Sequence, residues 1–186
     1  MTEKEKMIAG QMYNALDPVL VAERKEARLR FQAINSLNED QKEKRDELLY
    51  ELMGSAGKNL WIEPPFYCDY GYNIQLGDNV FLNYNCCILD VSIVKIGDNV
   101  MFAPGVQVLT ATHPIEAKAR NSGEEFAKPI TIGNEVWIGG NAIICPGVTI
   151  GDRAVIGAGA VVTRDIPSDV FAAGNPARAL KEIENG

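Results

Sequence analysis

The chain contains a single histidine, His113, and this residue is its strongest candidate for proton transfer. Imidazole suits a general base because its unperturbed pKa lies nearest to neutral pH. His113 is followed by Pro114 and by a stretch, 114–131, that interrupts an otherwise regular repeat. Long excursions from a repeat more often carry function than structure, so we expect a functional loop. The alternative is an exposed histidine at a turn.

Four cysteines and one histidine limit the remaining chemistry. The thiols are Cys68, Cys86, Cys87 and Cys145, and they form no C-x-x-C pair. No second histidine could activate a thiolate, so reduced core thiols are the stronger hypothesis and a nucleophilic cysteine the weaker one. A metal site built on several imidazoles is impossible within one chain. We therefore expect no metal, and we exclude a β-helical carbonic anhydrase.

The elements that position these residues belong to two parts of different composition. Residues 1–60 hold 21 of the 43 charged residues but only three of the 17 glycines. Their apolar residues have helical spacing, with stripes at Ile8, Met12 and Leu16 and at Leu20, Ala27, Phe31 and Ile34, and Asn38 is typical of a helix cap. This segment is too thinly apolar to fold alone, so we expect it to pack on the second part of the chain.

The second part, residues 61–186, contains twelve hexads in register, such as IGDNVM, IGNEVW and IGDRAV. The first position is always Leu, Ile, Val or Phe, and the fifth is always small or β-branched. The triplet IGD or IGN recurs at every third hexad, which predicts coils of 18 residues. Three short strands close a triangular coil, and stacked coils bury ladders of apolar side chains. This pattern favours a solenoid over a sandwich of alternating strands.

Charge and hydropathy exclude several partners. The 18 Lys and Arg residues stand against 25 Asp and Glu residues, and the net charge of −7 argues against nucleic acid as the main partner. No apolar run approaches the roughly 20 residues that a bilayer requires, and the N-terminus lacks the apolar core of a signal peptide. We expect a soluble cytoplasmic protein that binds no membrane.

Three polar residues depart from the repeat or flank it. Asn83 occupies a hexad position where the following coils have alanine or glycine, so we expect it to form functional hydrogen bonds. Asp69 precedes the first full coil, and Asp90 ends Ile88-Leu89-Asp90. Both carboxylates suit sugar hydroxyls. For all three residues, the alternative is a side chain that only stabilises a turn.

The later coils offer groups that suit a nucleotide-containing ligand. Trp137 follows Glu135-Val136, and we expect it at an exposed hexad corner, where an indole can stack on an adenine ring or a pantetheine arm, although packing is the alternative. Gly140 lies in a glycine-rich corner that leaves backbone N–H groups accessible. Arg164, Arg178 and Lys181 are basic residues in the same quarter of the chain.

Four stretches resemble the sugar O-acetyltransferases: EKEKMIAGQMYNALDPVL, YCDYGYNIQLG, TATHPIEAKARNSGEEFAKPITIGNEVWIGG and AAGNPAR. This family of hexapeptide-repeat acyltransferases includes the maltose, galactoside and nodulation acetyltransferases. The resemblance covers nearly the whole chain. The helical segment and the T-H-P loop are more specific than the hexads, which serine, antibiotic and nucleotide-sugar acyltransferases share.

The resemblance implies a fold and an assembly. We expect a mainly β protein, with a left-handed parallel β-helix and a short C-terminal helix over 61–186, an N-terminal helical segment over 1–60 and the long loop 114–131. The left-handed sense comes from the resemblance alone, because general chirality arguments favour right-handed crossovers. The family also implies a homotrimer with active sites between subunits.

The resemblance assigns roles to acceptor-side residues. His113 matches the catalytic histidine and Asn83 the active-site asparagine. Asp69 stands where galactoside acetyltransferase has a serine that touches the sugar. Asp17 is implied as an acceptor contact, and Asp90 falls close to a sugar-binding aspartate.

It also assigns residues to coenzyme A. Trp137 would stack on it, Gly140, Ala158 and Thr163 would hold the pantetheine arm, and Arg164, Arg178 and Lys181 would face the phosphates. Lys181 stands where some relatives have arginine, which keeps the charge but loses the bidentate geometry.

The function we expect is transfer of the acetyl group of acetyl-CoA to a sugar hydroxyl, such as the 6-OH of maltose, glucose or a related sugar. His113 would act as general base for direct attack on the thioester, with a backbone N–H near Gly140 stabilising the oxyanion. One alternative is a hexapeptide acyltransferase with a non-sugar acceptor. The other is a non-catalytic solenoid that serves as a scaffold or binds carbohydrate.

Overall fold

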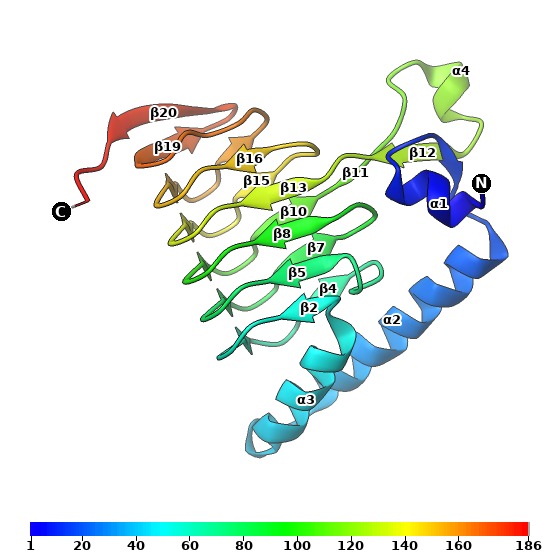
Figure 1. Ribbon diagram of the computed structural model, residues 1–186, viewed down its shortest axis with the longest axis horizontal. Coiled ribbons are helices and arrows are strands. Elements are labelled where there is room, and N and C mark those ends of the chain that lie inside the picture. Colours follow the sequence, from blue (N-terminus) through cyan, green and yellow to red (C-terminus); the bar gives the residue numbers. More distant parts are fainter. Residues whose placement is uncertain (186) are drawn as a thin grey trace.

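The computed structural model describes residues 1–185, and Gly186, the last residue of the range 61–186, lies outside the described residues. The chain forms a triangular β-solenoid with helices at its N-terminal end (Figure 1). The predicted mainly β, hexapeptide-repeat solenoid with an N-terminal helical segment is thereby confirmed.

Short strands build three faces, which the chain visits in a fixed order in each coil. Face 1 contains β2 (Ser55–Ala56), β5 (Ile74–Leu76), β8 (Val94–Ile96), β13 (Ile130–Ile132) and β16 (Thr149–Ile150). Face 2 contains β3 (Trp61–Ile62), β6 (Phe81–Leu82), β9 (Met101–Phe102), β14 (Trp137–Ile138), β17 (Val155–Ile156), β19 (Val170–Gly174) and β20 (Ala177–Glu182). Face 3 contains β4 (Tyr67–Cys68), β7 (Cys87–Leu89), β10 (Gln107–Leu109), β15 (Ile143–Ile144) and β18 (Val161–Val162). We call the turns between them the 1–2, 2–3 and 3–1 corners.

The first residue of each hexad points into the solenoid. Along face 2, for example, Leu82, Phe102, Ile138 and Ile156 form a fully buried ladder. Each coil exposes its apolar edge to the next coil, so burial and the parallel backbone hydrogen bonds arise together from stacking.

Coil length changes along the solenoid. On face 3, Tyr67 pairs with Cys87 and Cys87 pairs with Gln107, so the first coils contain 20 residues. Ile143 pairs with Val161, which gives the predicted 18 residues only in the later coils. The additional residues of the early coils lie at the 3–1 corner, where they form a larger turn.

The helical segment differs from the predicted stripes at its beginning. The helix α1 (Glu3–Ile8) opens with a capping box formed by Thr2 and Glu5, and the chain then turns at Gly10, whose φ is +69°. This left-handed turn suits glycine and ends the helix, so the expected stripe of Ile8, Met12 and Leu16 is wrong. Met7 is buried instead, whereas Leu16 is 75% exposed.

The other two predicted helices are present. The helix α2 (Pro18–Ser36) buries the predicted Leu20, Ala27 and Ile34. Asn38 caps the 3-10 turn η1 (Glu39–Gln41), which leads directly into α3 (Lys42–Leu52). Figure 1 shows α2 and α3 side by side at the N-terminal end of the solenoid.

The helical segment packs on the solenoid, as predicted. Ala27, Ile34 and Leu49 belong to the same apolar cluster as the interior ladders. The first strand of face 1, β2, already pairs with β5, so the solenoid begins just before residue 61. No helix within residues 1–185 is both long and apolar enough to cross a membrane.

The C-terminal end is a hairpin, so the expected short C-terminal helix is wrong. β19 adds to face 2 beside β17, and β20 pairs with β19 in antiparallel register. The turn between them contains Gly174, Asn175 and Pro176, with a φ of +101° at Gly174. A strand satisfies the backbone groups along the edge of β19, which a helix would have left unpaired.

Candidate active site

His113 lies at the 3–1 corner, at the root of the loop 114–131. It follows β11 (Ala111–Thr112), which pairs in antiparallel register with β12 (Glu124–Ala127). The loop also carries the short helix α4 (Ala117–Arg120) and projects from the solenoid beside α1 (Figure 1). The His113 side chain is 49% exposed and therefore open to a ligand.

Glu125 is the acidic partner of His113. Its Oε2 lies 3.4 Å from His113 Nε2, and its Oε1 accepts a hydrogen bond from the hydroxyl of Tyr13. Tyr13 belongs to β1 (Tyr13–Asn14), which pairs with β12 and brings the N-terminal segment to the loop. The Tyr13 ring is fully buried, and burial is the main cause that raises the pKa of its hydroxyl.

A polar pocket of about 320 Å³ lies beside His113, toward the coils that precede it in the solenoid. Asp69, Tyr70, Arg24, Arg28 and Glu125 contribute its polar groups; Ala15, Leu89, Val91 and Ala111 complete it. Arg24 donates a hydrogen bond to the Tyr70 hydroxyl at 2.7 Å. Burial raises the pKa of Asp69, an effect that the nearby Arg24 opposes. Donors and acceptors in alternation suit a ligand with many hydroxyl groups.

Asp90 supports this pocket from beneath and does not line it. Its buried Oδ1 accepts hydrogen bonds from the backbone N–H groups of Asp69 at 3.0 Å and Tyr70 at 2.9 Å, and its Oδ2 accepts one from Asn73 N–H at 3.2 Å. Burial raises the pKa of Asp90 to about 6. The Asp90 carboxylate therefore stabilises, through these three backbone hydrogen bonds, the turn that carries Asp69.

Asp17 also has a local role in this chain. Its Oδ1 caps α2 by accepting hydrogen bonds from the N–H groups of Val19 at 3.0 Å and Leu20 at 3.4 Å. It lines a hollow beside Glu3 and Lys4, not the pocket that contains His113.

An apolar hollow of about 470 Å³ lies on the opposite side of His113. Pro114, Ile115 and Phe126 come from the loop, and Pro146 comes from the same corner of the next coil; Thr112 and Lys128 complete the lining. His113 thus stands between a polar pocket and an apolar hollow.

Two of the predicted basic residues converge further along the same corner. Arg164 and Arg178 line one pocket of about 120 Å³ together with Asp165. Thr163 immediately precedes Arg164 in the chain. Lys181 lies opposite Phe171 in the terminal hairpin and does not line this pocket.

The remaining predicted residues lie elsewhere, on face 2 or at the 2–3 corner. Trp137 is 49% exposed on face 2. Gly140 and Ala158 follow the face 2 strands of successive coils, and Asn83 follows β6 at the same corner. Asn83 Oδ1 accepts a hydrogen bond from Tyr84 N–H at 2.8 Å. One chain therefore does not bring these residues to His113.

The backbone N–H group of Gly140 is available to a ligand. Gly139 N–H donates to Ile156 O and Asn141 N–H donates to Pro104 O, whereas Gly140 N–H has no acceptor within the described part of the chain. A free backbone donor in a corner is the group that an oxyanion requires.

Known proteins match this chain in sequence and in structure. Residues 6–57 match the family described as "Maltose acetyltransferase hexapeptide capping motif", and residues 129–164 match "Bacterial transferase hexapeptide (six repeats)". The crystal structure of a maltose O-acetyltransferase from Clostridium difficile 630 is 54% identical, with a TM-score of 0.98 and coverage of 100% of this chain and 99% of that one. The chain belongs to the maltose O-acetyltransferase-like family of hexapeptide acetyltransferases.

Two further structures of similar proteins contain the coenzyme. Galactoside acetyltransferase in complex with coenzyme A is 43% identical to this acetyltransferase, with a TM-score of 0.96 and coverage of 99% and 92% of the two chains. A hexapeptide-repeat acetyltransferase from Vibrio cholerae O1 biovar eltor, complexed with acetyl coenzyme A, is 37% identical, with a TM-score of 0.91 and full coverage of both chains.

Sequence reasoning missed four residues that the structure places around His113: Tyr13, Arg24, Tyr70 and Glu125. Tyr13 and Glu125 are 112 residues apart in the chain, and only the pairing of β1 with β12 joins them. The available signal was the position of Glu125, a carboxylate inside the loop that begins at His113. Within residues 1–185, no three His, Cys, Asp or Glu side chains are grouped as a metal site would need.

Proposed function

We propose that this chain transfers the acetyl group of acetyl-CoA to a sugar hydroxyl. The observation that carries the proposal is the order of sites along the 3–1 corner: the polar pocket, His113, the apolar hollow and then the pocket of Arg164 and Arg178. The sugar would match the polar pocket, the thioester and its flexible arm would match the apolar hollow, and a phosphate group would match the pocket of the two arginines. The names of the similar maltose and galactoside acetyltransferases support the same donor and acceptor classes.

His113 acts as the general base in this proposal. Acetyl-CoA would supply an activated thioester carbonyl. His113 would remove the proton from the sugar hydroxyl while the hydroxyl oxygen bonds to the carbonyl carbon, and the C–S bond would break with the thiolate as leaving group. General-base assistance is worth on the order of 10²–10⁴ in rate.

Backbone and amide groups would complete the site. The free N–H of Gly140 would stabilise the charge that develops on the carbonyl oxygen, a contribution on the order of 10²–10³ in rate. Asn83 would orient the acceptor or the imidazole. Trp137, Ala158, Thr163 and Lys181 complete the proposed coenzyme contacts.

These roles require more than one copy of the chain. His113 and Asp69 lie at the 3–1 corner, whereas Asn83, Gly140 and Ala158 lie at the 2–3 corner. We propose that a homotrimer brings the 2–3 corner of one subunit to the 3–1 corner of its neighbour, so that each site forms between two subunits. Asp17 would then face the acceptor from the helical segment.

The acceptor we propose is the 6-OH of maltose, glucose or a related sugar. Of the two carboxylates in the polar pocket, Asp69 would accept hydrogen bonds from the sugar, and Asp90 would act through it. We expect the reaction to take place in the cytoplasm and to need no metal.

Release of free thiol from acetyl-CoA tests the proposal, with glucose, maltose and a galactoside as acceptors. We expect sugar-dependent release that is unchanged by EDTA and falls at least about 100-fold in His113→Ala. The fold should survive this change because the side chain is half exposed, which circular dichroism and sedimentation would check. Coenzyme binding without release on any sugar would refute the sugar assignment. Failure to bind acetyl-CoA would refute the acetyltransferase function.

A further inference from the structure

We propose that the N-terminal segment, residues 1–17, is part of the catalytic apparatus: Tyr13 holds the Glu125 carboxylate against His113, and this carboxylate sets the orientation and tautomer of the imidazole. The inference rests on the proposed function, in which His113 is the base. Tyr13 and Glu125 are positioning residues in this scheme, since they act through His113.

Strand pairing places Tyr13 and Glu125 together. In the antiparallel ladder between β1 and β12, Tyr13 lies opposite Glu125 and Asn14 lies opposite Glu124. The hydroxyl of Tyr13 donates to Glu125 Oε1 from a fully buried ring. This partly buried contact joins the N-terminal segment to the loop that begins at His113.

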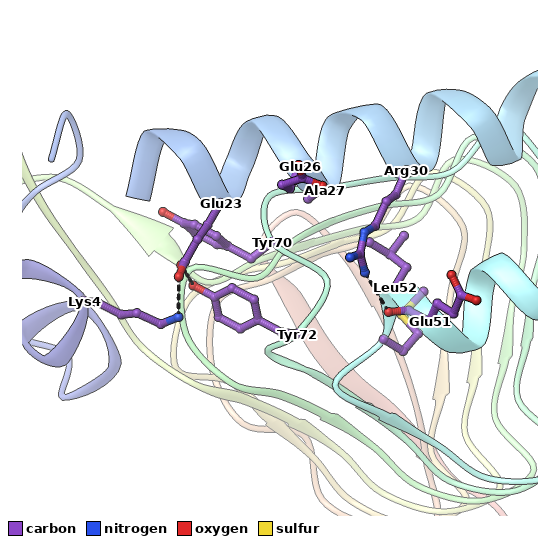
Figure 2. A pocket seen from close by; sticks show the side chains of 10 residues that line it. Lys4, Glu23, Glu26, Ala27, Arg30, Glu51, Leu52, Tyr70 and Tyr72 are labelled. Carbon is purple, nitrogen blue, oxygen red and sulfur yellow. Dashed lines mark hydrogen bonds and ion pairs between the residues drawn. The ribbon is translucent and has the colours of Figure 1, made fainter. Parts of the chain in front are cut away.

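The N-terminal segment is anchored on both sides of Tyr13. Lys4 on α1 points toward Glu23 on α2 and contacts its Oε1 at 2.7 Å, and Tyr72 donates to the other oxygen of Glu23 at 2.7 Å (Figure 2). Beyond Tyr13, Arg24 donates to Ala15 O at 2.5 Å.

Apolar packing fixes the same segment against the 3–1 corner. Its cluster comprises Met7, Tyr13, Leu20, Tyr70, Val91 and Ala127. Ala127 ends β12, so the cluster packs directly behind the strand that carries Glu125. The position of the carboxylate is therefore determined by the N-terminal segment.

One oxygen of Glu125 is hydrogen-bonded by the protein and the other lies close to the imidazole. Oε1 is bonded to Tyr13, and Oε2 faces His113 Nε2 at 3.4 Å. The side chain is only 17% exposed, which leaves little of it for an acceptor. This distribution favours positioning over direct sugar binding.

A carboxylate beside one nitrogen of a neutral imidazole favours the tautomer that carries the proton on that nitrogen. Glu125 thus places the proton on Nε2 and leaves Nδ1 to accept the proton of the sugar hydroxyl. When His113 becomes an imidazolium, the adjacent anion stabilises the positive charge.

The single histidine makes this proposal directly measurable. In NMR spectra of the full-length ¹⁵N-labelled protein, the shifts of the two imidazole nitrogens report which one carries the proton, with no overlap from other histidines. We expect the Nε2-protonated form to dominate in the wild type. Tyr13→Phe and Glu125→Gln should each move the equilibrium toward the other tautomer.

Kinetics provide the second readout. We expect kcat to fall about 10-fold in Tyr13→Phe and about 100-fold in Glu125→Gln, while KM for both substrates changes less than about twofold. Tyr50→Phe is the matched control, since it also removes a tyrosine hydroxyl, one that donates to Gly57 O at 3.0 Å far from the site. This control should leave kcat, KM and the imidazole shifts unchanged.

Three outcomes decide between the possibilities. Imidazole shifts that are identical in the wild type and both variants would overturn the proposal. A rise in KM for the sugar with unchanged kcat in Glu125→Gln would also overturn it and make Glu125 an acceptor ligand. A tautomer change in the two variants, combined with no transferase activity in the wild type, would support the positioning role and refute the proposed function.

Discussion

Asp69 and Asp90 lie on successive coils at one corner, and the carboxylate of Asp90 holds the backbone N–H groups of Asp69 and Tyr70. Asp69 is partly exposed in the polar pocket, whereas Asp90 is fully buried. Two aspartates that look equivalent in the sequence therefore have different tasks. Asp69 is available to a ligand, and Asp90 fixes the turn that presents it.

The Asp90 carboxylate predicts a specific pH dependence of stability. Its pKa of about 6 lies above the ordinary value of 3.8, so the folded chain binds this proton more tightly than the unfolded chain. The stabilisation is present at low pH and is lost as the pH rises from about 4 to about 6. In Asp90→Asn this loss should disappear, a difference on the order of 3 kcal/mol in the free energy of unfolding across the window. Thermal melts of both proteins between pH 4.5 and 7.5 would show it, and parallel curves would contradict it.

At the scale of elements, two adjacent glycines at the 2–3 corner have different reasons to be glycine. A Cβ at Gly139 would lie 2.5 Å from the backbone nitrogen of Ala158 in the next coil. A Cβ at Gly140 would meet nothing closer than Pro104 O at 3.3 Å. Gly139 is needed for the coils to stack, whereas a Cβ at Gly140 would make one tight contact that a shift of a few tenths of an ångström relieves.

This difference predicts separate effects of the same substitution at adjacent positions. Gly139→Ala should destabilise the protein by about 1–3 kcal/mol, because backbone atoms of the neighbouring coil must move. Gly140→Ala should destabilise the protein less, by about 1 kcal/mol or below, because only the 3.3 Å contact with Pro104 O must relax, and should raise KM for acetyl-CoA about 10-fold. Denaturant unfolding and steady-state kinetics would check the pair. Equal loss of stability in both variants would show that this corner has no open site.

At the scale of the whole molecule, the outer surfaces of faces 1 and 2 differ in polarity. The outward residues of face 2 form an apolar ladder, which comprises Trp61, Phe81, Met101, Trp137, Val155 and Phe171. Those of face 1 are polar and comprise Ser55, Gln75, Lys95, Thr131 and Thr149. A continuous apolar ladder on the outside favours contact with another subunit, in agreement with the proposed trimer.

A matched pair of charge substitutions tests this asymmetry. Met101→Glu places a charge in the ladder of face 2, where Met101 is 51% exposed in one chain, and should convert the trimer to folded monomers with at least 10-fold lower activity. Lys95→Glu reverses the charge at an outward site of face 1 in the same coil and should retain both the trimer and the activity. Sedimentation velocity and thiol release would measure the two effects. A trimer that persists in Met101→Glu would exclude face 2 from the interface.

The sequence by itself determined the solenoid, because the repeat is local. An apolar residue at the first position of each hexad predicts the interior ladder, and Leu82 and Ile138 are buried as this pattern requires. The second and third helices also followed from local spacing and caps. The stripe predicted for the first helix and the predicted C-terminal helix were wrong, since a turn at Gly10 ends α1 early and the edge of β19 is paired by a strand.

The sequence also singled out His113 as the candidate base, because it is the only histidine and begins the one long interruption of the repeat. Only the tertiary structure decided what surrounds it. The pairing of β1 with β12 brings Tyr13 to Glu125, and the stacking of coils buries Asp90 beneath Asp69. Periodicity depends on neighbours along the chain and can be read from one segment. Contacts across 112 residues depend on which strands pair and in what register, which no single segment specifies.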